Sequence, residues 1–336
     1  RLLVIFIVFA EGFLNRVTIF GLSRTVAVTA VIGLSQMVVL GIGQMNLAVG
    51  AIGGMIAIFT GWLMQSIGLP VWAAVIVALL FAALVGFING LIITKTGINS
   101  FIVTLGMGSV ITGLVFILTK AEAFRDLPKA YTKFGKARWV KIDWLELSPL
   151  IFIAIGIAIL LAFIYKTTTF GRWMLATGAN PRAAELSGVP IDFVVQATHA
   201  LSGLLAGAAG IMLVSRLGSA LPSIGENWLL PSFAAPIVGG TLLSGGAVAV
   251  FGTLLGALLI ESVSVGLTLM NVPSFWIQLF VGLVLLLAVL VDRARTVAVA
   301  RGQRGIRQAP AGATKSLGRW RSHPRKAVGC RRWRTR

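Results

Sequence analysis

The chain has few charged side chains and almost none of the residues that build metal or redox sites. Of its 336 residues only 12% are charged and 57% are hydrophobic, whereas a soluble globular domain has charges at about a quarter of its positions. One cysteine (Cys330) and two histidines (His199, His323) cannot form a disulfide framework and leave too few soft ligands for a zinc or iron-sulfur site. We therefore expect no metal or cofactor, and an outer surface that faces lipid.

Acidic residues are absent from the last 36 positions, which hold 12 of the 29 lysines and arginines. The formal net charge of +19 is therefore mainly a property of the C-terminal segment. We expect residues 293–336 to form a basic, disordered cytoplasmic tail beside anionic lipid, with no nucleic-acid partner.

Long uncharged runs divide residues 1–292 into about ten predicted membrane spans, because a helix needs about 20 apolar residues to cross the hydrocarbon layer. The predicted fold is therefore all-α and polytopic. The clearest spans lie near residues 25–43, 47–65, 70–93, 101–119, 148–165, 193–215, 252–270 and 275–291. A short glycine-rich run near 232–243 and an N-terminal run at 2–10 complete the set.

Two polar stretches separate the spans. Residues 120–147 carry seven basic and four acidic side chains and are expected to hold a short helix. Residues 166–192 contain Asn180-Pro181, a typical helix start, followed by helix formers up to Gly188, a typical helix stop. This pattern predicts a short amphipathic helix between two spans.

Glycine is abundant, with 39 residues, although each costs roughly 1 kcal/mol relative to alanine inside a helix. Pairs spaced by four residues place two hydrogen-only surfaces on one helix face and allow backbones to touch. Such pairs are Gly50 and Gly54, Gly86 and Gly90, Gly203 and Gly207, and Gly252 and Gly256. They predict closely packed helices.

Two further glycine clusters, residues 41–50 and 239–246, fall between apolar runs and are expected to break two of the membrane helices. Non-helical backbone at membrane depth is tolerated only where it is buried in protein or lines a watery cavity. Broken segments in both halves point to a transport pathway. The alternative is that both are tight turns at the membrane surface.

Several separated motifs stand out along the chain. They are Gly178-Ala-Asn-Pro-Arg-Ala-Ala-Glu-Leu-Ser-Gly188, Leu201-Ser-Gly203, Ser215-Arg-Leu-Gly-Ser-Ala220, Ile237-Val-Gly-Gly-Thr241, Asn89-Gly90, Thr94-Lys95 and Phe101-Ile-Val-Thr-Leu-Gly106. Together they resemble the ribose-type sugar permeases of ATP-binding-cassette importers. Their order and spacing match the family, and the resemblance covers about residues 20–292.

The resemblance implies a multi-pass permease domain, residues 1–292, in the bacterial inner membrane, which would import a monosaccharide such as ribose, xylose, arabinose or galactose. The permease would be a transport subunit and not an enzyme. Its implied partners are a second permease subunit, identical or related, two cytoplasmic ATP-binding subunits or one fused double ATPase, and a periplasmic sugar-binding protein. ATP would be bound by the partner.

By the same resemblance, residues 166–192 form the cytoplasmic coupling loop and residues 120–147 a periplasmic loop. The residues expected to couple to the ATPase are Gly178, Asn180, Ala183, Ala184, Ser187 and Gly188. One departure from the family stands out: its usual Gly-Ile-Asp-Leu-Ser-Val-Gly is here Gln44-Met-Asn-Leu-Ala-Val-Gly50, with Asn46 for the acid and Ala48 for the serine. The lost charge would suit a different ligand.

A neutral sugar needs amide and hydroxyl partners along its path. The candidates for the path or gate are Asn46, Asn89, Asn99, Thr104, Thr241 and Ser244, together with Gly239 and Gly240 of the second glycine cluster. The alternative role for each polar residue is a hydrogen bond between helices or a helix cap.

The main alternative function is an ion-coupled secondary transporter of a small polar solute. It would require paired ionisable groups near the membrane midplane, and Glu261 with His199 is the sparse candidate pair. Glu226 could contact a binding protein or cap a helix. The chain lacks a Gly-x-x-x-x-Gly-Lys-Ser/Thr motif, as expected if ATP binds to another subunit.

Overall fold

The computed structural model describes residues 15–142 and 145–273, and then 275–276, 278–284, 286–287 and 290. The chain divides into one unit of residues 1–289 and another of residues 290–336, of which Leu290 alone is described. The N-terminal run 2–10 and the basic tail 293–336 lie outside the described residues, so both stay predictions.

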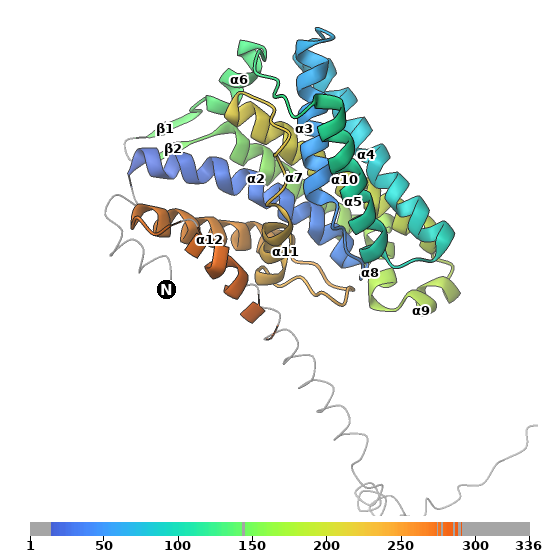
Figure 1. Ribbon diagram of the computed structural model, residues 1–336. Helices are drawn as coiled ribbons and strands as arrows, with labels where there is room; N and C mark the ends of the chain where they lie inside the picture. Colours follow the sequence, from blue (N-terminus) through green and yellow to red (C-terminus); the bar gives the residue numbers. More distant parts are fainter. Residues whose placement is uncertain are drawn as a thin grey trace, which may run out of the picture. The chain divides into compact units, whose positions relative to one another are not determined.

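The described part is mostly helical, which confirms the predicted helical architecture, while the count of about ten spans stays a prediction (Figure 1). The elements are α2 (Arg16–Gly41), α3 (Val49–Gln65), α4 (Val71–Thr96), α5 (Ser100–Thr119), α6 (Lys129–Lys136), β1 (Val140–Ile142), β2 (Leu145–Leu147), α7 (Pro149–Thr167), α8 (Thr169–Ala179), α9 (Pro181–Leu186), α10 (Ile191–Leu217), α11 (Leu229–Val238) and α12 (Val250–Leu269). Six of the described helices are long and apolar enough to cross a membrane: α2, α4, α5, α7, α10 and α12. Helices α3 and α11 are apolar but shorter.

Local sequence sets the ends of these helices. The side chains of Asn99 and Ser148 accept hydrogen bonds from the first-turn backbone of α5 and α7, which begin there. Gly97 and Gly218 end α4 and α10 in the left-handed conformation, where glycine carries no steric penalty.

Helices α2 and α10 form the centre of the bundle. Helix α10 packs against α4, α2 and α3, while α2 also packs against α12, α11 and α7. In each of the two helices 61% of the apolar stretch is buried, against 17% in α5. Helix α5 is therefore the least enclosed of the six long apolar helices.

The spaced glycine pairs lie at close backbone contacts, as predicted. A methyl group on Gly86 would overlap the carbonyl oxygen of His199, and one on Gly203 would overlap that of Ala82, so α4 and α10 touch through these glycines. The other six positions are also closed, by backbone atoms at Gly50, Gly54, Gly90, Gly252 and Gly256 and by the Ala82 side chain at Gly207.

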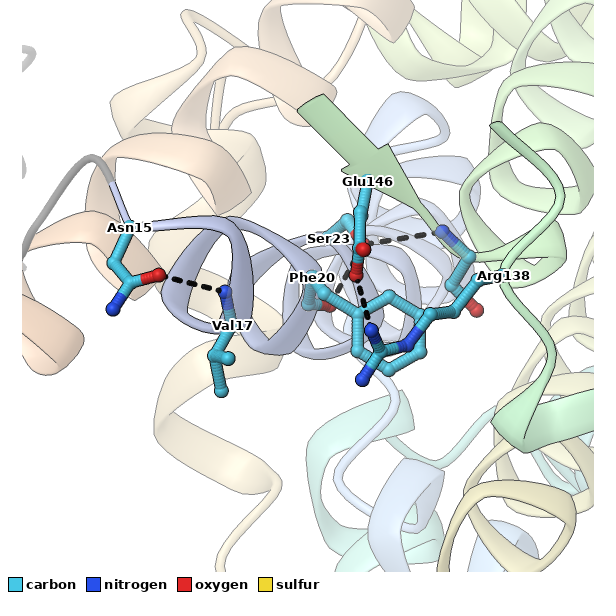
Figure 2. A network of polar contacts seen from close by, with 7 residues as sticks. Asn15, Val17, Phe20, Ser23, Arg138 and Glu146 are labelled. Carbon is cyan, nitrogen blue, oxygen red and sulfur yellow. Dashed lines mark hydrogen bonds and ion pairs between the residues drawn. The ribbon is translucent and has the colours of Figure 1, made fainter. Parts of the chain in front are cut away.

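The segment of residues 120–147 lies at the opposite end of the bundle from α8 and α9 (Figure 1). It holds the predicted short helix, α6, and an antiparallel hairpin in which Val140 pairs with Leu147. Arg138 Nη1 lies 2.7 Å from Glu146 Oε2, and the Arg138 guanidinium lies 5.0 Å from the centre of the Phe20 ring (Figure 2). These contacts anchor the hairpin to the start of α2.

Candidate functional site

Helices α2 and α3 are separated by residues 42–48, which we call the first glycine segment. These residues are not helical, and Gly43 has a positive φ of 73°. Asn46 and Ala48 are fully buried. Buried backbone outside a helix must find hydrogen-bond partners within the protein.

Side chains supply those partners. The backbone N–H of Met45 donates to Ser100 Oγ at 3.2 Å, and that of Leu47 donates to Thr104 Oγ1 at 3.0 Å. Both hydroxyls belong to the first turns of α5. The N–H of Ala48 donates to Asn46 Oδ1 at 3.0 Å.

A buried polar cluster holds the other side of the first glycine segment. Asn46 Nδ2 donates to Ser202 Oγ of α10 at 2.9 Å, and Ser202 Oγ lies 3.1 Å from Ser35 Oγ of α2. His199 Nε2 lies 2.9 Å from Gln44 Oε1. The structure thus brings the predicted Asn46 and Thr104 to one segment, together with partners that the sequence did not reveal.

The second glycine segment, residues 239–249, connects α11 to α12. Thr241 is buried, and its Oγ1 accepts a hydrogen bond from the N–H of Ala249 at 3.2 Å. Gly240 and Ser244 are exposed, and Gly239 is half-buried. The N–H of Gly246 donates to the carbonyl of Gly41 at 3.0 Å, so the second segment contacts the end of α2.

The end of α8 meets both glycine segments. A methyl group on Gly178 would overlap the carbonyl oxygen of Gly41 and lie 2.5 Å from the backbone nitrogen of Gly246. One on Gly245 would lie 2.6 Å from the nitrogen of Gly43. We call Gly41, Gly178 and Gly246 the glycine junction, because three distant stretches of chain meet there through bare backbone.

The predicted interspan helix is α9. Asn180 caps it through a 3.1 Å hydrogen bond from the N–H of Ala183, and Gly188 follows its end with a φ of 83°. Of the predicted coupling residues, Ala184 is buried and Gly178 lies at the glycine junction, while Asn180, Ala183, Ser187 and Gly188 are exposed. The sequence did not single out Leu186, whose side chain is 85% exposed, nor the separate helix α8.

Two predicted path residues make no hydrogen bond to the glycine segments. Asn89 of α4 is fully buried, and neither its amide oxygen nor its nitrogen has a hydrogen-bond partner among the described residues. Asn99 is exposed and caps α5 by accepting a hydrogen bond from Phe101.

Comparison with known proteins identifies the family. Residues 18–290 match the family described as the permease component of the branched-chain amino acid transport system. The chain belongs to this family. Its six long apolar helices and its family membership place it in the bacterial inner membrane, which it crosses several times.

Curated relatives carry the names of sugar importers, which confirms the resemblance found in the sequence. The ribose import permease of Bacillus subtilis is 35% identical over 88% of this chain and 90% of its own length. The L-arabinose permease of Azospirillum brasilense is 33% identical over 84% and 82%, and the fructose import permease of Rhizobium meliloti is 30% identical over 85% and 81%. No solved structure gives a significant match.

The two ionisable residues considered for ion coupling, Glu261 and His199, lie far apart in this permease. Glu261 Oε1 accepts a hydrogen bond from Thr29 at 2.6 Å and interacts electrostatically with Arg216, near the end of α10. His199 lies 17 positions before Arg216 on that helix, a separation of about 25 Å along its axis. Glu261 and His199 therefore do not form a pair.

Histidine, cysteine and acidic side chains, which could bind a metal ion, do not cluster among the described residues. Within the described ranges, no three of them are placed to hold a metal ion.

Proposed function

We propose that this chain is the membrane-spanning subunit of an ATP-driven importer for a neutral monosaccharide, of the ribose, xylose, arabinose or galactose type. The names of its relatives support a sugar, although the family description names amino acids. About ten crossings, two of them interrupted at the glycine segments, make up the proposed permease domain of residues 1–292.

In the proposed complex, two permease subunits, identical or related, pair in the membrane. Two ATP-binding subunits, or one fused double ATPase, meet the coupling loop of residues 166–192 in the cytoplasm, where the basic tail also lies. A periplasmic sugar-binding protein delivers the cargo on the side of residues 120–147. Lipid surrounds the bundle.

The glycine junction is the observation that carries this proposal. Helix α9 directly follows α8, and through Gly178 the last turn of α8 contacts Gly41, directly before the first glycine segment, and Gly246 of the second. A partner that moves α9 would therefore displace both interruptions of the bundle at once, with no side chain in between to absorb the motion.

The exposed Leu186 supports docking of a protein on α9. It is a large apolar side chain at the end of a short helix, and 85% of its surface is exposed. Apolar anchors of this kind fill pockets in a partner and contribute much of the binding energy.

The test replaces Leu186 with glutamate and uses Leu186→Met as the matched control. Tagged permease is expressed with its chromosomal neighbours and purified in mild detergent, and ATP-dependent ribose uptake is measured in vesicles. We expect wild type and Leu186→Met to retain a stoichiometric ATP-binding subunit, and Leu186→Glu to bind it about tenfold more weakly.

A contrary result would be a permease that purifies alone and transports ribose without ATP. It would indicate the ion-coupled transporter instead. The separation of Glu261 from His199 speaks against that function.

A further inference from the structure

Two hollows open on either side of the first glycine segment. One, of about 460 Å³, lies between α3, α5 and the turn before α11, and we call it the outer hollow. The other, of about 390 Å³, lies between the end of α4, the start of α5 and the start of α10, and we call it the inner hollow. Both volumes fall within the range of small-molecule sites.

The layer between the two hollows is thin. In the first glycine segment, Gly43 and Gln44 line the inner hollow and Leu47 lines the outer one. On α5, Ser100 lines the inner hollow and Leu105 the outer one. Five residues of helix rise about 7.5 Å, so little more than one helical turn separates the hollows.

Two neutral hydrogen bonds close this layer. They are the bonds from the N–H groups of Met45 and Leu47 to the hydroxyls of Ser100 and Thr104, which we call the α5 latch. On its other side the segment is fixed to α10 through Asn46 and Ser202. Because α5 is the least buried of the long apolar helices, it can move away from the segment with the smallest loss of packing.

The chemistry of the hollows selects an uncharged cargo. Among the described residues that line them there is no lysine, arginine or histidine. The polar groups are hydroxyls, amides and carboxylates: Ser109, Thr112 and Glu226 in the outer hollow, and Gln44, Thr94, Asn99, Ser100 and Asp192 in the inner one. The phosphate of a sugar phosphate and the carboxylate of an amino acid would find no cation among these residues, although the ammonium of an amino acid could meet Glu226 or Asp192. A polyol finds acceptors for its hydroxyls and brings no group that lacks a partner.

We infer that the two hollows are successive stations on the path of a neutral polyol, and that the α5 latch is the barrier between them. This inference rests on the proposed function, since it takes the chain to be a permease for a sugar. Its test is independent of ATP, of partner subunits and of the identity of the cargo.

The test measures which side of the membrane reaches each hollow. In a Cys330→Ser background, Ser109→Cys reports on the outer hollow and Ile98→Cys, which lines the inner hollow, reports on the other side. A small charged methanethiosulfonate is added to one face of sealed vesicles. We expect Ser109→Cys to react from one face only and Ile98→Cys from the opposite face only.

The latch is then removed by combining Ser100→Ala with Thr104→Val. We expect Ile98→Cys to react with reagent added to the membrane face from which Ser109→Cys reacts. Its rate should be at least about fivefold higher than in the protein with an intact latch. Thr104→Ser keeps the hydroxyl, so the barrier should stay closed and Ile98→Cys should stay unreactive from that face. Thr119→Val is the matched control on α5, because the Thr119 hydroxyl bonds only within its own helix.

Two outcomes would overturn the inference. One is reaction of both cysteines from the same face with the latch intact. The other is unchanged reactivity of Ile98→Cys in the latch variant while Ser109→Cys still reacts normally, which shows that the protein is folded. If the cysteine variants with an intact latch show the expected accessibility but the wild-type complex shows no ATP-driven ribose uptake, the result counts against the proposed function and not against this inference.

A second measurement tests the cargo chemistry. Proteoliposomes that contain the latch variant are loaded with radiolabelled ribose or leucine. We expect ribose to leak at least about fivefold faster than from Thr119→Val liposomes, and leucine to leak at the control rate. Equal leakage of leucine and ribose would contradict selection of an uncharged cargo.

Discussion

The two glycine segments interrupt the bundle in different ways. Backbone bonds tie Gly43 and Gln44 of the first segment to the end of α2, but Met45, Asn46 and Leu47 are held by side chains of α5 and α10. The stability of this segment therefore depends on hydrogen bonds that other helices supply. The second forms turns of its own, with bonds between Leu242 and Ala247 and between Leu242 and Gly245, and one side-chain bond from Thr241. Movement of α5 or α10 would therefore break hydrogen bonds of the first segment. The second segment keeps its own bonds and would be displaced mainly by direct contact with its neighbours.

The largest effect is expected where both segments meet. Gly178→Val would force a branched side chain against the backbone of Gly41 and Gly246, which cannot move aside as a side chain can. We expect ATP-driven uptake to fall at least about tenfold, with ATP hydrolysis no longer coupled to it. Gly156→Val in α7 is the control, because nothing lies within 4 Å of that position. Equal uptake by the two variants would show that the junction transmits nothing.

The next effect is specific to the first glycine segment. Asn46→Ala leaves the N–H of Ala48 without its partner in a buried place and removes a bond to Ser202, so we expect a loss of about 1–3 kcal/mol in the free energy of unfolding. Thermal unfolding in detergent measures it. Asn46→Asp keeps the acceptor for the N–H of Ala48 but buries a carboxylate with no cation bonded to it, so its loss should be at least as large. A clearly smaller loss for the aspartate would contradict this account.

A smaller effect is expected in the second glycine segment. Thr241→Val removes the acceptor for the N–H of Ala249, which should cost about 1 kcal/mol, while Thr241→Ser keeps the hydroxyl and should cost less. The same unfolding measurement compares the two. If Thr241→Val proved more harmful than Asn46→Ala, the contrast between the segments would have to be reversed.

The smallest effect is expected at a site that neither segment contacts. Glu261→Gln keeps an oxygen to accept the hydrogen bond from Thr29, and Glu261 has no titratable partner in His199. Sugar uptake and its dependence on pH should be unchanged. A flattened pH profile would revive the ion-coupled alternative.

Short-range rules predicted the local features well. Asn180, Pro181 and Gly188 marked α9 because capping and helix termination depend on a few neighbouring residues. The glycine spacing predicted close helix contacts at these positions for the same reason, since a four-residue repeat defines one helix face, but it did not say that α4 meets α10.

The hydrogen-bond partners that come from distant parts of the chain could not be predicted from the sequence. Ser100 and Ser202 bind the first glycine segment from helices 55 and 156 positions away, and nothing local distinguishes them from other serines in apolar runs. Asn89, chosen for its polarity, has no partner among the described residues, while Gln44 and His199 pair across the bundle. Polarity in a span marks a residue as notable but does not say what it faces.

The closed glycine positions between α4 and α10 also make the coding sequence intolerant of mutation there. Any amino-acid replacement at a glycine codon adds at least one carbon, and at Gly86 or Gly203 that carbon would meet a backbone carbonyl. No conservative exchange exists at these sites. In a saturation library selected for growth on the transported sugar, we therefore expect almost no replacements at Gly86 and Gly203, and many at exposed positions nearby such as Leu80 and Leu84.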